Sequence, residues 1–337
     1  MSIKIKIGII GCSTIAKTSI IPAIIQSKHT ELSFIGSRTN NRAKQFADEF
    51  NCKNFGSYDD VLSSNDVNAV YISTPIGLHE KWVIESAKAK KHILCEKSST
   101  TSFNSAKKMV ETSKNYDVRL MEGLMFKFHP SHKFVNKILN NFKTLFSFYS
   151  QYGFPPISRK NIRYSKELGG GIFNDAICYP ISASRMIFKD EPTEIFTNMV
   201  FDQKSKVDTK ASISLKFTKG RIAHADVGYD LEYENFYSVW GKNGSLKLTR
   251  SFNIPESMKA KIHVINNKKK ITYTISPSNH FLLMFDYFAN LCKNKFDHSF
   301  HEERELLLQS LIMDYGRKSA KHNKLFKIKY PKILLKD

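Results

Sequence analysis

The chain has 337 residues, of which 41% are hydrophobic and 25% are charged, and its lysines and arginines exceed its acidic residues by enough to give a formal net charge of +21. This ordinary globular composition excludes a disordered or fibrous protein, and a chain of this length can bury a large core without disulfides or metal ions. The sequence contains no apolar run long enough to span a membrane and no cleavable leader pattern, so it predicts a cytoplasmic protein.

The excess of positive charge favours binding to polyanions, including phosphorylated substrates. The lysines are spread along the chain, however, and the longest basic run is Lys268-Lys269-Lys270, beside two asparagines in a predicted turn. Because no block of five or six like charges occurs, we interpret the charge as a lysine-rich solvated surface. We expect no nucleic-acid partner and no membrane partner. The five cysteines form no Cys-x-x-Cys pair and indicate reduced structural thiols.

The first third of the chain alternates short apolar strands with helices. The strands are expected at residues 5–11, 32–37, 68–73, 92–95 and 118–122, and the helices between them at 14–28, 41–50, 58–64, 79–90 and 103–115. Such alternation is typical of βαβ units and a parallel, doubly wound sheet. We therefore predict an α/β domain over residues 1–124.

The pattern changes near residue 125. Strand-like segments linked by short turns occupy residues 144–152, most of 194–249, and the pair 260–265 and 270–275, while helices are expected at 131–140, 172–188, 280–292 and 302–321. Strands linked by hairpins form antiparallel sheets. We predict an α+β domain over residues 125–337, with an open, mostly antiparallel sheet of five or six strands. The amphipathic helix at 172–188 is expected to cover one face of it, and the last helix could pack back on the first domain.

The turn after the first strand has the features of a phosphate-binding loop. Gly11 lies at the tight turn, Ala16 is the small residue that lets helix and strand pack closely, and Ser13 takes the place of the central glycine. The helix that opens at Thr14 and Ile15 supplies unpaired N–H groups and partial positive charge. These residues predict a dinucleotide-binding Rossmann domain.

The end of the second strand bears on the choice of cofactor. In NAD-binding domains, an acidic residue at this position hydrogen-bonds to the ribose 2′-hydroxyl. This chain instead has Ser37, Arg38 and Arg42, with no acidic residue between the strand and Asp48. A carboxylate would repel a 2′-phosphate, whereas hydroxyl and guanidinium groups bind one. We therefore expect NADP(H) to be favoured over NAD(H). The alternative is that Arg38 only lies on a solvated loop.

Three further segments carry functional information in addition to the glycine turn. They are Ser73-Thr74-Pro75-Ile76-Gly77-Leu78-His79, then Cys95-Glu96-Lys97, and then Glu167-Leu168-Gly169-Gly170-Gly171 followed by Asp175 and Tyr179. In this order and at this spacing the chain resembles the Gfo/Idh/MocA oxidoreductases over nearly its whole length. The resemblance implies a Rossmann domain and a substrate-binding domain whose sheet often forms a dimer face, hence a homodimer or homotetramer.

The resemblance also implies roles for particular residues. Lys97 matches the lysine of the family's Glu-Lys-Pro motif, which contacts substrate and the nicotinamide ribose, although Ser98 here replaces a proline that often follows a cis peptide. Asp175 matches the family's acidic residue after the glycines. Tyr179 stands where many members have histidine. A tyrosine at this position resembles glucose–fructose oxidoreductase and the reductases of nucleotide-linked keto-deoxysugars.

The chemistry of these residues is consistent with ketone reduction. Asp175 and Tyr179 are four residues apart on one expected helix, so both should face one cleft. A hydride added to a ketone requires a proton for the developing alkoxide, and Tyr179 could donate it if a nearby ammonium lowers its pKa. Lys97 could do so and also stabilise the oxyanion. The alternative for Tyr179 is a buried aromatic side chain on an amphipathic helix, with its hydroxyl hydrogen-bonded to the backbone.

Other residues are candidates for binding. Thr74 and Pro75 end a strand at the sheet edge where a cofactor would bind, and Glu96 and His79 could contact the ribose and the nicotinamide side, although His79 could instead only cap a helix. Substrate contacts are expected from Lys127 and Arg163, besides Lys97, Asp175 and Tyr179, although Arg163 is also one of many basic residues.

No metal site is expected, because neither His129 with His132 nor the C-terminal group His298, His301, Glu302 and Glu303 has convincing ligand spacing. The favoured function is NADP(H)-dependent reduction of a sugar keto group, with nucleotide-linked keto-deoxysugars of surface polysaccharide or glycan biosynthesis as the expected small-molecule substrates. The alternatives are a dehydrogenase of free sugars, inositol or other polyols, and a non-catalytic cofactor-binding regulator.

Overall fold

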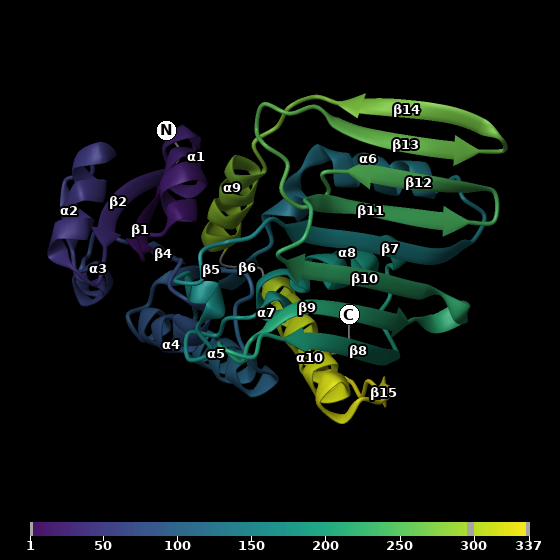
Figure 1. Ribbon diagram of the computed structural model, residues 1–337. Helices are drawn as coiled ribbons and strands as arrows, with labels where there is room; N and C mark the ends of the chain where they lie inside the picture. Colours follow the sequence, from purple (N-terminus) through teal and green to yellow (C-terminus); the bar gives the residue numbers. More distant parts are fainter. Residues whose placement is uncertain (1–2, 295–299, 335–337) are drawn as a thin grey trace. The chain divides into compact units, whose positions relative to one another are not determined.

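The structure is a computed structural model that describes residues 3–294 and 300–334. The chain divides into two compact units, the first made of Met1–Leu124 with Phe281–Leu307 and the second of Met125–His280 with Leu308–Asp337 (Figure 1). Each unit is built around one β-sheet. In the two described ranges, no helix combines the length and apolar character needed to cross a membrane.

The first unit contains a six-stranded parallel sheet in the order β3-β2-β1-β4-β5-β6. Its strands are β1 (Ile5–Ile10), β2 (Thr30–Gly36), β3 (Asn54–Gly56), β4 (Ala69–Ile72), β5 (His92–Glu96) and β6 (Leu120–Gly123). The α/β class and the doubly wound order are confirmed, and only the three-residue β3 was not expected. Because the chain runs outward on both sides of β1 and β4, the strand order reverses between them, which is where such sheets bind ligands.

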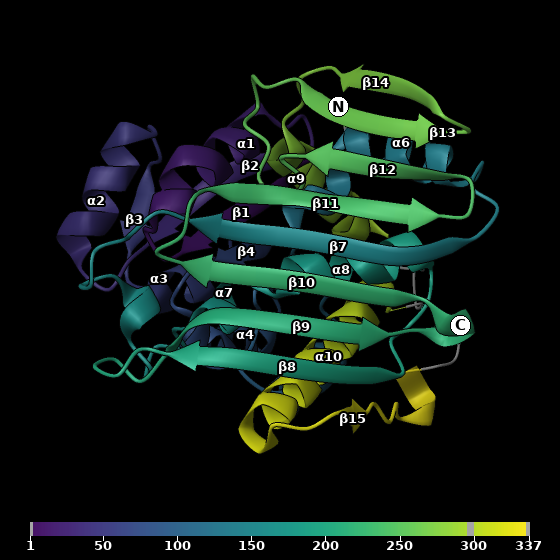
Figure 2. The same ribbon diagram turned by 45° about the vertical axis from the view of Figure 1, so that its right-hand side comes forward.

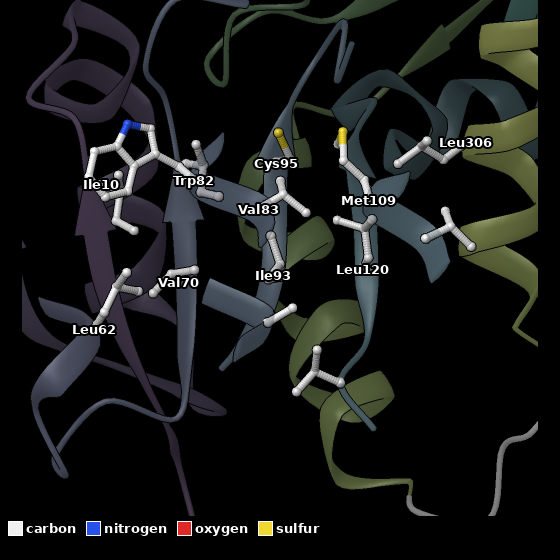
Figure 3. Packing of buried hydrophobic residues seen from close by; sticks show 14 of the residues in the cluster. Ile10, Leu62, Val70, Trp82, Val83, Ile93, Cys95, Met109, Leu120 and Leu306 are labelled. Carbon is white, nitrogen blue, oxygen red and sulfur yellow. The ribbon is translucent and has the colours of Figure 1, made fainter. Parts of the chain in front are cut away.

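Helices flank this sheet on both faces, so its central strands are buried, as all four residues of β4 are. The helices between strands are α1 (Ile21–Gln26), α2 (Asn40–Glu49), α3 (Tyr58–Ser63), α4 (His79–Lys88) and α5 (Phe103–Asn115), with the π-helical turn η1 (Ala16–Ile20) before α1 and the 3₁₀ turn η2 (Ile76–Leu78) before α4. Figure 3 shows Trp82 and Val83 of α4 and Met109 of α5 packed with Ile93 and Leu120 of the sheet. Full burial of each such side chain stabilises the fold by roughly 1.5–3 kcal/mol.

Residues 281–307 belong to the first unit, whereas the sequence-based division placed them in the second domain. This segment contains most of α9 (His280–Lys293) and the beginning of α10 (His301–His322). Phe285 packs its ring 6.1 Å from that of Tyr71, and Asp286 accepts a 2.6 Å hydrogen bond from Ser27. Glu303 forms a buried 3.0 Å ion pair with Arg119. The sequence-based division differs from the observed one because these contacts join residues that are far apart in the sequence, and no local pattern indicates them.

The second unit contains one nine-stranded sheet in the order β14-β13-β12-β11-β7-β10-β9-β8-β15, rather than five or six strands. Its strands are β7 (Leu145–Phe154), β8 (Glu194–Phe201), β9 (Asp208–Lys216), β10 (Ile222–Tyr229), β11 (Glu234–Gly241), β12 (Gly244–Thr249), β13 (Ala260–Asn266), β14 (Lys269–Ile275) and β15 (Phe326–Lys327). The sheet is larger than expected because β7 lies between β10 and β11 and joins two groups of hairpins. The β7–β10 pair is parallel and the other pairs are antiparallel, so the mostly antiparallel class is confirmed.

The expected helix at 172–188 is two helices, α7 (Ile172–Ala176) and α8 (Cys178–Phe188), which meet at Ile177. Pro180 has no N–H group, so the hydrogen bond to the carbonyl one turn earlier cannot form there. All of α8 except Met186 is buried, so this helix is not amphipathic as expected. Figure 2 shows α6 (Pro130–Leu139) and α8 behind the sheet. The remaining short helices are η3 (Met125–Phe128), η4 (Ile162–Tyr164), η5 (Thr218–Gly220) and η6 (Lys332–Leu334).

Candidate active site

The glycine turn after β1 lies against the loop after β4. Gly11 has a φ of +112°, and a Cβ atom there would come within 3.0–3.1 Å of the main chain of Ser73 and Thr74. The Ser73 hydroxyl donates a 2.7 Å hydrogen bond to the Gly11 carbonyl. Only glycine fits both the backbone angle and this approach. The two loops therefore form one edge at the reversal point of the sheet.

Ser13 caps the helix that follows the turn. Its hydroxyl accepts a 3.1 Å hydrogen bond from the N–H of Ala16, and Ala16 is fully buried against the strand. Ser13 and Ile15 are partly exposed and Thr14 is exposed. A capped helix start with accessible residues at its first positions fits an anionic phosphate group. Binding of a dinucleotide pyrophosphate by the turn residues Gly11, Ser13, Thr14 and Ile15 stays a prediction.

The end of β2 lies beside this turn. The N–H of Gly11 donates to the carbonyl of Gly36, the last residue of β2, and Ser37 follows it as a buried residue. Arg38 is exposed. Arg42 donates from Nε and Nη2 to the carbonyl of Cys12, at 3.1 and 2.9 Å. The guanidinium group of Arg42 therefore supports the glycine turn, and a contact between the exposed Arg38 and a 2′-phosphate stays a prediction.

His79 connects the loops after β4 and β5. This buried side chain begins α4, with Nε2 2.8 Å from the carbonyl of Thr74 and Nδ1 3.2 Å from that of Ser98. Burial lowers the pKa of His79 to about 4, so the ring is neutral at pH 7 and has one N–H to donate. Both ring nitrogens face protein carbonyls, and a cofactor contact by His79 stays a prediction.

Lys97 directly follows β5 and is partly buried, and the peptide bond between it and Ser98 is cis. The partly buried Glu96 accepts a 2.5 Å hydrogen bond from the hydroxyl of Tyr71, and its other oxygen lies 3.2 Å from the N–H of Lys97. Burial raises the pKa of Glu96, opposed by the Tyr71 hydrogen bond and the charge of Lys97.

A second carboxylate binds the main chain two residues after Lys97. Glu122, from β6, accepts a 2.8 Å hydrogen bond from the N–H of Ser99. Sequence reasoning singled out Glu96 and Lys97 but missed Tyr71 and Glu122. The available signal was a polar group near the end of each of two otherwise apolar strands.

In the second unit, the three glycines fold the chain back on itself before α7. Gly169 and Gly171 have φ values of +78° and +108°, and a Cβ on Gly170 would come 2.5 Å from the carbonyl of Arg163. The N–H of Gly171 donates to that same carbonyl at 2.9 Å. Asp208 then accepts a 2.6 Å hydrogen bond from the N–H of Phe173. This fold-back brings Arg163 beside the first turn of α7.

Asp175 forms an ion pair with Arg163. The carboxylate lies 2.6 Å from Nε of Arg163 and accepts a 3.4 Å hydrogen bond from the hydroxyl of Tyr229. The charge of Asp175 raises the pKa of the Arg163 guanidinium. Two residues predicted to bind substrate are therefore joined to each other. Asp175 and Tyr179 belong to different helices, α7 and α8, so the expectation of a single helix carrying both is wrong.

Tyr179 is held by aromatic rings. Only 3% of the residue is exposed, and its ring stacks on Phe252 at 5.3 Å and meets Phe126 and Tyr152 edge-on. Its hydroxyl donates toward the sulfur of Met125 at 3.7 Å. Lys127, two residues further along η3, is partly buried. The structure thus contains the buried packing that the alternative interpretation of Tyr179 described.

Among residues 3–294 and 300–334, no three potential metal ligands come together. His132 contacts the hydroxyl of Tyr237 and the carbonyl of Ser251 through its two ring nitrogens. His298 lies outside the described residues.

Comparisons with known proteins match both units. A family model described as the NAD-binding Rossmann fold of an oxidoreductase family matches residues 5–124, and a model of the GFO/IDH/MocA C-terminal domain matches residues 141–247. The chain belongs to the Gfo/Idh/MocA oxidoreductase family. This confirms the resemblance, the fold class and the assignment as an oxidoreductase.

Two relatives act on sugars according to their names. A dTDP-3,4-didehydro-2,6-dideoxy-alpha-D-glucose 3-reductase from Saccharopolyspora spinosa is 31% identical over 262 residues, which cover 77% of this chain and 79% of that protein. A D-xylose 1-dehydrogenase (NADP(+)) from Haloferax volcanii is 30% identical and covers 84% of this chain and 87% of its own length.

A solved structure is similar over nearly the whole chain. It is a tyrosine-to-phenylalanine variant of the 3-ketoreductase KijD10 from Actinomadura kijaniata, in complex with TDP-benzene and NADP. Its TM-score is 0.90 at 27% sequence identity, covering 94% of this chain and 98% of the other.

Proposed function

We propose that this protein reduces the keto group of a sugar with hydride from NADPH, and that its substrate is a nucleotide-linked keto-deoxysugar. The observation that carries the proposal is the position of Lys97, at the carboxyl end of β5 on the same sheet edge as the capped glycine turn. A relative named as a dTDP-keto-deoxysugar 3-reductase and a similar structure in complex with NADP and TDP-benzene support it.

NADP fits the described residues of the first unit. The accessible helix start at Ser13 and Thr14 would hold the pyrophosphate, and Arg38 with Ser37 would bind the 2′-phosphate, because the segment from Ser37 to Ala47 contains no acidic residue. Arg42 would contribute by supporting the turn. Thr74 and Pro75 follow β4, His79 begins α4 and Glu96 ends β5, near the carboxyl edge of the sheet where the nicotinamide ribose would be bound.

The bound cofactor supplies hydride, and the protein supplies orientation, electrostatics and a proton. We assign Lys97 to stabilise the oxygen that gains charge as hydride reaches the carbonyl carbon. We assign Tyr179 to donate the proton that this oxygen needs. Asp175 would hold the guanidinium of Arg163, which with Lys127 would contact the substrate's anionic groups. The products are an alcohol and the oxidised cofactor.

The alternative is a dehydrogenase of a free sugar or polyol, which the NADP(+)-dependent D-xylose dehydrogenase among the relatives supports. Two experiments distinguish the ketosugar reductase from the dehydrogenase. The protein is first titrated with NADPH and NADH while the quenching of Trp82 and Trp240 fluorescence is followed. Steady-state rates are then compared for a TDP-linked 3-keto-deoxysugar with NADPH and for D-xylose and inositol with NADP. A rate with the linked ketosugar at least about a hundredfold above the others supports the proposal. Binding of neither cofactor would contradict it and favour a protein without this activity.

We also propose that the chain forms a homodimer or homotetramer through the face of the nine-stranded sheet opposite α6 and α8. Trp240 and Phe146 are 62% and 51% exposed and contact each other at 6.2 Å between ring centroids. Exposed aromatic side chains of this size favour an interface. Light scattering after size exclusion is expected to report a dimer or tetramer, and Trp240→Arg is expected to weaken it. A wild-type monomer at micromolar concentration would contradict this proposal.

A further inference from the structure

Two main-chain amides at Lys97, its own and that of Ser99, are each bound by a carboxylate. The N–H of Lys97 lies 3.2 Å from Oε2 of Glu96, and the N–H of Ser99 donates to Oε1 of Glu122 at 2.8 Å. Charge-assisted hydrogen bonds of this kind are roughly twice as strong as neutral ones. The backbone on both sides of the lysine is therefore fixed by side chains.

The two carboxylates come from neighbouring strands. β5 and β6 are parallel, and Glu122 lies opposite Cys95 in the register while Gly123 lies opposite Glu96. Glu122 therefore reaches across from the adjacent strand to the loop that follows β5. A contact between residues 23 positions apart orients the loop relative to the sheet, which a bond within the loop could not do.

Tyr71 adds a third strand to this arrangement. It belongs to β4, is fully buried, and donates its hydroxyl to Oε1 of Glu96. A buried hydroxyl needs a partner, and this one directs the Glu96 carboxylate. The loop itself is also buried, with Ser98 and Ser99 each 1% exposed, so its amides must be satisfied by protein groups.

We propose that Glu122 and Tyr71 are positioning residues for Lys97, Glu122 through the amide of Ser99 and Tyr71 through Glu96. This inference rests on the proposed function of Lys97. A displacement of a reacting group by about 1 Å can cost about a hundredfold in rate, so such supports matter for the chemical step. The two residues act on Lys97 and not on the glycine turn, so they should affect kcat more than NADPH binding.

The test compares Glu122→Ala with Glu122→Gln, because the glutamine amide oxygen can still accept the Ser99 N–H. Glu122→Ala should lower kcat about 10- to 100-fold and leave the dissociation constant for NADPH within about twofold. Glu122→Gln should keep kcat within about threefold of the wild type. Tyr71→Phe, which preserves the ring, should lower kcat about 3- to 10-fold. This variant tests the positioning proposal if Glu122→Ala does not fold.

Asp60→Ala is the matched control. Asp60 also accepts a 2.8 Å hydrogen bond from a main-chain N–H, that of Ser57 at the start of α3, and should cost stability without lowering kcat. If Glu122→Ala keeps kcat within twofold, or if Glu122→Gln loses as much as Glu122→Ala, positioning through the Ser99 amide is wrong.

A readout that needs no substrate separates this inference from the proposed function. The rate at which acetic anhydride acetylates Lys97 in the folded protein can be measured by peptide mass spectrometry. It should change at least about threefold in Glu122→Ala, and not in Glu122→Gln or Asp60→Ala. This pattern in a wild-type protein that reduces no ketosugar would support the positioning and contradict the proposed function. A ketosugar reductase with unchanged Lys97 reactivity and kcat in Glu122→Ala would contradict the positioning alone.

Discussion

The surroundings of Lys97 and of Tyr179 differ in the forces that fix them. Lys97 is partly exposed and lies in a polar network, with carboxylates bound to the amides around it. Tyr179 is buried among aromatic rings, with its hydroxyl directed at a methionine sulfur. A hydrogen-bonded support is directional, whereas aromatic packing fixes a ring mainly by filling space. Substitutions at the first residue should therefore affect activity, and substitutions at the second should affect stability as well.

The largest effect is expected from Lys97→Ala. Loss of the group assigned to stabilise the oxyanion should lower kcat about 10³-fold, with little change in thermal stability because a partly exposed side chain is removed. Steady-state kinetics and differential scanning calorimetry measure the two effects. Lys107→Ala, at an exposed position of α5, is the control. An unchanged kcat in Lys97→Ala would remove the catalytic assignment.

Two variants of Tyr179 sharpen the contrast. Tyr179→Phe keeps the ring and should lower kcat about 10²-fold with little loss of stability, because general acid catalysis contributes in this range. Tyr179→Ala should also cost about 3 kcal/mol of unfolding free energy, since it leaves a cavity among the rings. A loss of less than tenfold in Tyr179→Phe would show that another group donates the proton. Tyr152→Phe is the matched control at a neighbouring ring.

Acid should destabilise the fold through buried histidines of the second unit. Burial lowers the pKa of His132 and of His280 to about 3, compared with 6.5 for an unfolded histidine. Between these values the unfolded state binds more protons, so the stability present above pH 6.5 is lost as the pH falls. His132 alone should contribute about 2 kcal/mol of this loss at pH 5. Urea unfolding at pH 7.5 and 5.0 measures it, and His132→Gln should reduce the difference. An equal difference in both proteins would mean that other groups are responsible.

The smallest effect is expected from Arg38→Asp, at the proposed binding position of the cofactor's 2′-phosphate. Arg38→Asp exchanges the exposed cation after β2 for a carboxylate that repels a 2′-phosphate. The preference for NADPH over NADH should fall about tenfold or more, with little change in NADH binding. Fluorescence titration with both cofactors measures the ratio. If the ratio does not change, Arg38 does not read the 2′-phosphate.

Much of the first unit could be predicted because its signals are local. The apolar run before Gly11, the small residue at position 16 and the absence of an acid after the second strand all lie within single βα units. Parallel strands place their carboxyl ends at one edge of the sheet. Gly11, Thr74 and Lys97, which each follow such an end, therefore had to lie at that same edge. Arg42 was the exception, because the Cys12 carbonyl that it binds presents no sequence signal.

The second unit was less predictable because its contacts are distant in sequence. Each strand could be found from its alternation, but the insertion of β7 between β10 and β11 depends on pairings across more than 70 residues. The break between α7 and α8 was within reach, since Pro180 marks it. The pairing of Asp175 with Arg163 was not, because it depends on how the glycines fold back.

The sequence by itself determined the fold class and the family, and it predicted the dinucleotide-binding turn and the preference for NADP(H), because these depend on residue types at short spacing. Only the tertiary structure decided that residues 281–307 belong to the first unit, that one sheet has nine strands, and that Tyr71 and Glu122 lie around the Lys97 loop. The physical reason is that a buried polar group must find a partner, and which strand supplies that partner depends on packing rather than on local sequence.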